Sequence, residues 1–146
     1  MLAHHRTLVS RIRIAAVVAL MTAVTTAHAD DVTNSDRILC SISTLMLCVE
    51  DGECFPLSPL DLDVPQFLVM DLKKKTITTT EASTDKRVSK VENLLRENGR
   101  TFLQGVENNR AYSILIEDDI GQFSAAIARD GITVSVFGSC TDADIR

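Results

Sequence analysis

Short runs of alternating apolar and polar residues, separated by turn-forming residues, fill most of the chain after residue 65. In Gln66–Leu72, for example, Leu68, Met70 and Leu72 share one face of an extended chain. Such alternation is typical of a β-strand with one buried face. It predicts strands at residues 66–72, 100–106, 111–117, 122–129 and 132–137, and the β-branched stretch at 76–80 predicts one more.

The segments between these strands carry the residues that tight turns require. Asn98-Gly99 is the strongest two-residue hairpin signal in the chain, and Asp130-Gly131 is similar. Further turns are predicted at Lys73–Lys75, Glu107–Asn109 and Asp118–Gly121, where Asp118 serves the backbone of its turn. A succession of hairpins predicts an up-and-down antiparallel meander.

A meander of about eight strands has two edges to protect, and closing into a small barrel or folding into a sandwich does this. We therefore predict an all-β fold, an eight-stranded barrel or sandwich, with its few aromatic side chains in the core. Residues 58–65 form a connector, because Pro59 and Pro65 do not fit a central strand.

One segment leaves an alternative open. Val88, Val91 and Leu94 fit helical spacing, whereas Asn98-Gly99 calls for a strand before it. We favour a strand; if residues 87–97 are helical, the fold becomes α+β.

The first 29 residues have the three parts of a secretory leader. Residues 1–13 are basic, residues 14–26 are apolar, and Ala27-His28-Ala29 is a cleavage site, so that the mature chain begins at Asp30. The apolar run is shorter than the roughly 20 residues that span a bilayer, which predicts no stable membrane insertion. We expect one exported domain over residues 30–146, in the periplasm or secreted.

The four cysteines are an even set in an exported chain, which predicts two disulfides. Three pairings are possible, and we favour Cys48–Cys54 across an Asp-Gly turn, with Cys40–Cys140 joining the first strand to the last. The spacing lacks the Cys-x-x-Cys units of zinc or redox sites. Gly138 is expected to allow a bend that directs Cys140 toward its partner.

Removal of the leader takes all three histidines, and the chain has no tryptophan. Histidine is the usual general base near neutral pH and the commonest metal ligand. Catalysis by Ser-His-Asp or Cys-His groups is therefore excluded after cleavage. We expect no enzyme activity, no cofactor and no metal.

Charge is unevenly distributed. The leader holds three of the 15 basic residues and none of the 20 acids, so that residues 30–146 carry a net charge of −8. This excludes a general nucleic-acid binder. The middle of the chain is basic, and its Lys73, Lys74, Lys75 and Arg110, together with Glu107, form a possible binding rim for a periplasmic protein or an anionic glycan.

Two stretches, Gly105-x-Glu107-x-x-Arg110-Ala111-Tyr112-Ser113 and Phe137-Gly138-Ser139-Cys140-Thr141, resemble small exported bacterial proteins of unassigned function. The resemblance implies a periplasmic β-rich domain. In size, export and barrel form the chain is also similar to periplasmic lysozyme inhibitors of the MliC type, although it lacks their Ser-Gly-x-x-Tyr stretch. We expect a non-catalytic binding or envelope-associated module. The alternatives are an inhibitor of a secreted hydrolase such as lysozyme and a carrier of small apolar ligands.

Overall fold

The computed structural model describes residues 30–62 and 64–144, and its regular structure is almost wholly β-strand. The leader predicted at residues 1–29, with Ala29 at its cleavage site, lies outside the described residues. A short 3-10 turn, η2 (Pro59–Leu62), lies in the predicted connector. The strands are β1 (Arg37–Val49), β2 (Cys54–Leu57), β3 (Phe67–Asp71), β4 (Thr76–Thr79), β5 (Val88–Lys90), β6 (Asn93–Glu97), β7 (Arg100–Glu107), β8 (Arg110–Glu117), β9 (Gln122–Arg129) and β10 (Ile132–Asp142).

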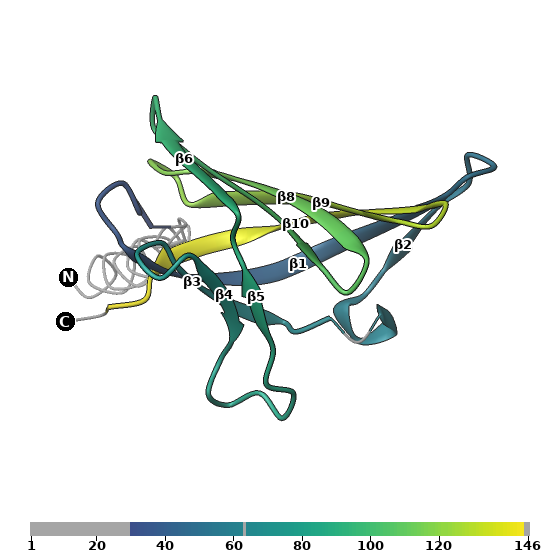
Figure 1. Ribbon diagram of the computed structural model, residues 1–146, viewed down its shortest axis with the longest axis horizontal. Coiled ribbons are helices and arrows are strands. Elements are labelled where there is room, and N and C mark those ends of the chain that lie inside the picture. Colours follow the sequence, from purple (N-terminus) through teal and green to yellow (C-terminus); the bar gives the residue numbers. More distant parts are fainter. Residues whose placement is uncertain (1–29, 63, 145–146) are drawn as a thin grey trace, which may run out of the picture.

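All strands belong to one antiparallel sheet, in the order β5-β4-β3-β1-β10-β9-β8-β7-β6. The sheet curls into a half-barrel, with β1 and β10 side by side through its middle (Figure 1). On its other side β1 pairs first with β3 and then, nearer its end, with β2. The all-β prediction is confirmed, and the four predicted hairpins after residue 97 join β6 through β10 in succession.

The described chain has ten strands, so the expected number of eight is wrong. One additional strand is β2, which forms directly after the turn at residues 50–52 and pairs with β1 from Leu45 to Cys48. The segment 87–97 contains two strands, β5 and β6, so the helical alternative is wrong as well.

Between β5 and β6 the chain turns a corner and changes its neighbours. The amide of Val91 donates to the Lys75 carbonyl beside β4 at 2.9 Å, and the next amide, Glu92, donates to Gln104 of β7 at 2.9 Å. The two edges of the sheet therefore meet in one continuous segment. Gly105 of β7 makes this approach possible, because a Cβ atom there would lie 2.7 Å from the Lys90 carbonyl.

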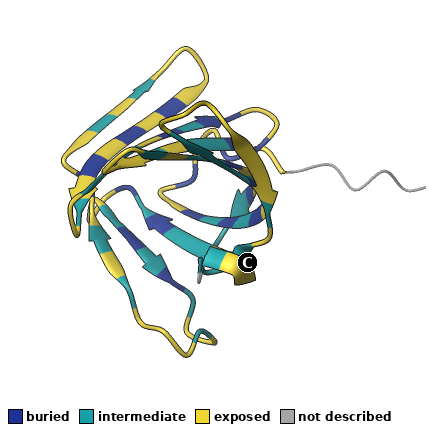
Figure 2. Ribbon diagram, turned by 90° about the vertical axis from the view of Figure 1, so that its right-hand side faces the viewer, coloured by how far each residue is buried: buried dark blue, intermediate teal, exposed yellow. Residues whose placement is uncertain are grey.

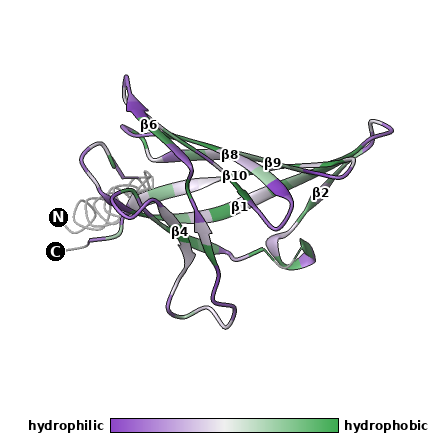
Figure 3. Cartoon of the chain, in the orientation of Figure 1, coloured by the Kyte–Doolittle hydropathy of each residue, from purple (hydrophilic) through white to green (hydrophobic). Residues whose placement is uncertain are grey.

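The core follows the predicted alternation. On β7 the pattern of burial alternates strictly, and on β8 Ile114 and Ile116 point inward. Figure 2 shows buried residues alternating with exposed ones along the strands, and Figure 3 shows hydrophobic residues along β1 and hydrophilic ones at the turns.

The expectation that the aromatic side chains lie in the core is wrong for most of the phenylalanines. Phe123 is buried, but the other four are between 36% and 48% exposed. The alternation explains this for two of them, because Phe102 and Phe137 occupy outward positions next to buried neighbours. The four exposed side chains are Phe55, Phe67, Phe102 and Phe137.

Both predicted disulfides are present. Cys40 lies directly opposite Cys140 in the β1–β10 pair, where both residues are buried, and Cys48 lies opposite Cys54 in the β1–β2 pair. The first bond joins strands that are 100 residues apart in sequence, and the second closes a short hairpin.

Gly138 has a different role from the one expected. The register of β1 on β10 shifts between Ile42 and Thr44, which leaves Ser43 as a β-bulge opposite this part of β10. A Cβ atom on Gly138 would lie 1.9 Å from the Ser41 carbonyl oxygen. The glycine is therefore needed for the close approach of two backbones.

Residues 30–36 cover one end of the half-barrel and are held there by a partly buried ion pair. Arg96 of β6 contacts Asp118 at 3.0 Å and also donates to the carbonyls of Ser35 at 3.0 Å and Val32 at 2.5 Å. The other carboxylate oxygen of Asp118 accepts a 2.8 Å bond from the buried Thr101 hydroxyl. The view of Asp118 as only a turn residue is thus incomplete, because its side chain is 2% exposed and pairs across the barrel end.

Candidate binding cavity

An apolar cavity of about 140 Å³ lies inside the half-barrel. Its walls come from strands on both sides of the β1–β10 pair, so it depends on the curl of the whole sheet. The apolar lining includes Ile42 of β1, Leu68 of β3, Ile77 of β4, Ile114 of β8, Phe123 of β9 and Val136 of β10. Those on β3, β8, β9 and β10 occupy the apolar faces that the alternation predicts.

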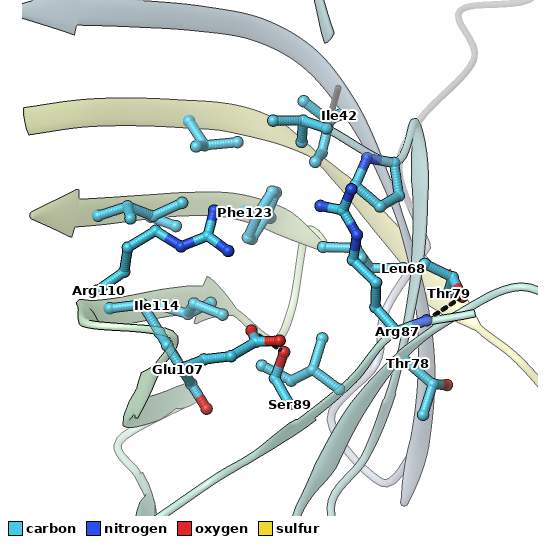
Figure 4. Close-up of a pocket in the computed structure, with 17 residues that line it drawn as sticks. Ile42, Leu68, Thr78, Thr79, Arg87, Ser89, Glu107, Arg110, Ile114 and Phe123 are labelled. Atoms are coloured by element: carbon cyan, nitrogen blue, oxygen red, sulfur yellow. Dashed lines mark hydrogen bonds between the residues drawn. The ribbon is translucent and has the colours of Figure 1, made fainter. Parts of the chain in front are cut away.

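The mouth of the cavity is polar and charged. Arg110 begins β8 on the same face as Tyr112 and Ile114, and Glu107 ends β7. On the facing segment, Arg87 precedes β5 and Ser89 lies within it. Figure 4 shows these side chains around the mouth, with the apolar residues deeper inside.

Hydrogen bonds fix part of this mouth. The Ser89 hydroxyl donates to the Glu107 carboxylate, which ties β5 to the end of β7. The backbone amide of Arg87 donates to the Thr79 hydroxyl at 3.1 Å, and its guanidinium donates to Asp85. The positions of Arg87, Ser89 and Glu107 are therefore set by contacts among themselves and with their neighbours.

Arg110 differs from these residues. It lies directly opposite Glu107 in the β7–β8 register, but the carboxylate is engaged by Ser89. Among the residues that the structure describes, the Arg110 guanidinium forms no ion pair. A positive charge at the edge of an apolar cavity thus has no carboxylate in contact with it in the part of the chain that the structure describes.

Tyr112 lines the cavity between Arg110 and Ile114. Its hydroxyl donates to the Lys90 carbonyl at 2.6 Å, at the corner between β5 and β6. Burial raises the pKa of the Tyr112 phenol, and the negative charges of Glu107 and Glu92 raise it further. Tyr112 is the only tyrosine in a chain without tryptophan, so its fluorescence reports on the cavity alone.

A second, polar hollow lies outside the first. It is lined in part by Arg87, Glu107 and Arg110, which also line the apolar cavity, and by Lys86 and Asn108. The two hollows are therefore adjacent, and these three charged residues belong to both.

The structure separates the residues of the predicted binding rim. Glu107 and Arg110 lie together at the cavity mouth, but the three lysines lie at the turn between β3 and β4 and do not line the cavity. There Lys73 pairs with Asp36 at 2.5 Å, and Lys74 pairs with Asp71 at 3.2 Å. The five residues therefore do not form one surface.

Sequence reasoning missed Arg87 and Ser89. Both lie at inward positions that alternate with Val88 and Lys90, but they are polar. Alternation identifies which residues share a face and does not indicate which face turns inward when the apolar residue, Val88, is the exposed one.

No three His, Cys, Asp or Glu side chains among the described residues are grouped so that they could hold a metal ion. In the same part of the chain, no helix is long and apolar enough to span a membrane. Comparisons with protein-family models, with curated proteins and with solved structures found no match.

Proposed function

We propose that this chain is a non-catalytic, exported binding module whose half-barrel takes up a small apolar ligand, or the apolar part of a larger one. The observation that carries the proposal is the apolar cavity of about 140 Å³ with an open, charged mouth. Ligand sites in proteins are typically concave and mostly apolar, with a few polar groups that orient the ligand.

The size of the cavity limits the ligand. An engineered protein cavity of about 150 Å³ binds benzene, so the present one accommodates a group of about six carbon atoms. Burial of each methylene contributes about 0.8 kcal/mol, which corresponds to about a fourfold change in Kd. Affinity should therefore increase with chain length and level off near six carbons.

Export is the second part of the proposal. The leader-like sequence at residues 1–29 supports it, and so do the two disulfides, which fit an oxidising compartment. A periplasmic location is the form of export that we favour, because the chain lacks an Asn-x-Ser/Thr sequon.

The binding proposal is tested with uncharged probes. Residues 30–146 are titrated with the linear alcohols from ethanol to 1-octanol, and binding is followed by Tyr112 fluorescence and by the NMR shifts of the Ile77 and Ile114 methyl groups. We expect Kd to fall about fourfold per carbon up to about six carbons. Absence of any shift in both signals across the series would refute the proposal.

Two alanines on adjacent positions of β9 provide a matched pair of variants. Ala125 lines the cavity, and Ala126 is exposed on the opposite face. Ala125→Leu fills the cavity and should weaken 1-hexanol binding by about tenfold or more, the equivalent of about two lost methylenes. Ala126→Leu should leave it unchanged. Equal effects of the two substitutions would place the binding site elsewhere.

A further inference from the structure

We infer that the ligand of this cavity is a monoanionic amphiphile, a carboxylate with a short apolar tail, whose head group binds Arg110 at the cavity mouth. The inference rests on the proposed function, because it assigns the head group of the ligand whose tail fills the cavity.

The first argument is the direction of the two guanidinium groups. Both belong to residues that line the apolar cavity, although one lies at the start of β8 and the other just before β5. Figure 4 shows the Arg110 and Arg87 side chains extending from opposite sides toward the interior. Arginine side chains are almost never fully enclosed unless they are paired. The Arg87 guanidinium is held by Asp85, whereas the Arg110 guanidinium has no ion pair among the described residues.

The second argument is that the Glu107 carboxylate is hydrogen-bonded to a residue other than Arg110. As the direct cross-strand neighbour of Arg110, it is the natural carboxylate partner within the chain. Its carboxylate instead accepts a hydrogen bond from Ser89 on the facing segment, and no ion pair joins it to Arg110. The Arg110 guanidinium thus remains available to a carboxylate from outside.

The third argument is the balance of charge. Three charged residues line the apolar cavity: Arg87 is paired with Asp85, Glu107 accepts a hydrogen bond from Ser89, and Arg110 has no ion pair among the described residues. The whole of residues 30–146 carries −8, so the cavity mouth is a local exception. A ligand with one negative charge matches the single guanidinium of Arg110, whereas the second charge of a dianion would be repelled by Glu107.

The geometry of the groups favours a carboxylate. A guanidinium offers planar, paired N–H donors that match the two oxygens of a carboxylate. With its head at the mouth, the tail of the ligand points along the inward faces of β8 and β9, toward Ile114 and Phe123. Hexanoate has the combination of charge and tail that the cavity requires.

The test compares three probes with the same tail: hexanoate, 1-hexanol and hexylamine, titrated at low salt with Tyr112 fluorescence and methyl NMR shifts. We expect hexanoate to bind about tenfold or more tightly than 1-hexanol, since hydrogen bonds to charged groups are worth at least this factor, and hexylamine to bind most weakly. Added salt should weaken only hexanoate binding.

Variants assign the head-group site. Arg110→Gln should reduce the ratio of hexanoate to 1-hexanol affinity to near one, and Arg110→Lys should give an intermediate ratio, because lysine keeps the charge and loses the paired donors. Arg100→Gln is the matched control, since Arg100 is exposed at the far end of β7 from Glu107. Circular dichroism verifies that each variant is folded.

The outcomes separate the two proposals. If no probe binds, the proposed function fails. If 1-hexanol binds as tightly as hexanoate, or if Arg110→Gln leaves the ratio as high as Arg100→Gln does, the cavity is a binding site but the assignment of an anionic head group is overturned.

Discussion

Replacing Asp118 with alanine removes the carboxylate that fastens residues 30–36 across one end of the half-barrel. The side chain of Asp118 is 2% exposed, and its two oxygens accept bonds from Arg96 at 3.0 Å and from the Thr101 hydroxyl at 2.8 Å. The backbone bonds of residue 118 to Val32 and Gly99 do not involve the side chain and remain possible.

The expected loss of stability follows from these two hydrogen bonds. A hydrogen bond to a charged group is worth about 1.5–3 kcal/mol, so the two together contribute about 3–6 kcal/mol. The Arg96 side chain is 27% exposed and keeps its bonds to the Val32 and Ser35 carbonyls, so water and backbone compensate for part of the loss. We therefore expect a decrease of about 3 kcal/mol in the free energy of unfolding, or about 12 °C in Tm.

The assay is urea unfolding, followed by far-ultraviolet circular dichroism and by Tyr112 fluorescence. Asp119→Ala is the control, because Asp119 is the exposed neighbour in the same turn and its removal should change stability by less than about 0.5 kcal/mol. Thr101→Val should show a smaller loss than Asp118→Ala, and the double variant should lose less than the sum of the two. If Asp118→Ala is as stable as Asp119→Ala, the ion pair does not hold this end together.

Three further predictions follow from the packing and the pKa shift. Gly138→Ala should destabilise by about 3 kcal/mol, because the new Cβ atom would meet the Ser41 carbonyl; a urea midpoint like that of the unmodified protein would contradict this. Replacing Cys40 and Cys140 together with alanine should lower the free energy of unfolding by about 4–5 kcal/mol, because it frees a loop of about 100 residues in the unfolded chain; a loss below about 1 kcal/mol in urea unfolding would be inconsistent with it. The raised pKa of Tyr112 means that the unfolded chain ionises first, so stability should fall as pH rises above about 10. Urea unfolding between about pH 8 and 11 should therefore show a shallower decline for Tyr112→Phe, and equal slopes would show that Tyr112 does not contribute.

The hairpins could be predicted because their residues determine backbone conformation. Asn98 and Gly99 both have positive φ, 52° and 71°, as does the pair Asp130 and Gly131. Asparagine, aspartate and glycine tolerate this region better than other residues. Local chemistry therefore specified where most of the strands end.

The corner between β5 and β6 could not be predicted, and it explains the helical ambiguity. Before the corner, Ser89 and Val91 face inward. After it, Leu94 and Arg96 face inward, so the alternation shifts by one residue at the corner. This shift places buried residues three apart, which is also the spacing of a helix. Only the pairing of β5 with β4 and of β6 with β7 distinguishes the two cases, and that information lies in distant parts of the chain.

The candidate site was only half predictable for a related reason. Glu107 and Arg110 stood out as a charged turn, but the cavity exists only because strands from both ends of the sheet face each other around it. The lysines of the β3–β4 turn were equally charged and lie elsewhere, paired with Asp36 and Asp71. The charges in the sequence identified candidate binding residues, but the curl of the sheet determines which of them line the cavity.

The pairing of β1 with β10 also determines the order in which the molecule can assemble. Most of the other strand pairs are hairpins between consecutive strands, and such hairpins form within microseconds. The β1–β10 pair joins the two ends of the domain, so it cannot form before the last strand has been synthesised. Until then β1 has an open edge along most of its length. The Cys40–Cys140 bond lies within this late pair, and an oxidised chain that unfolds therefore keeps its slowest contact and should refold faster than a reduced one.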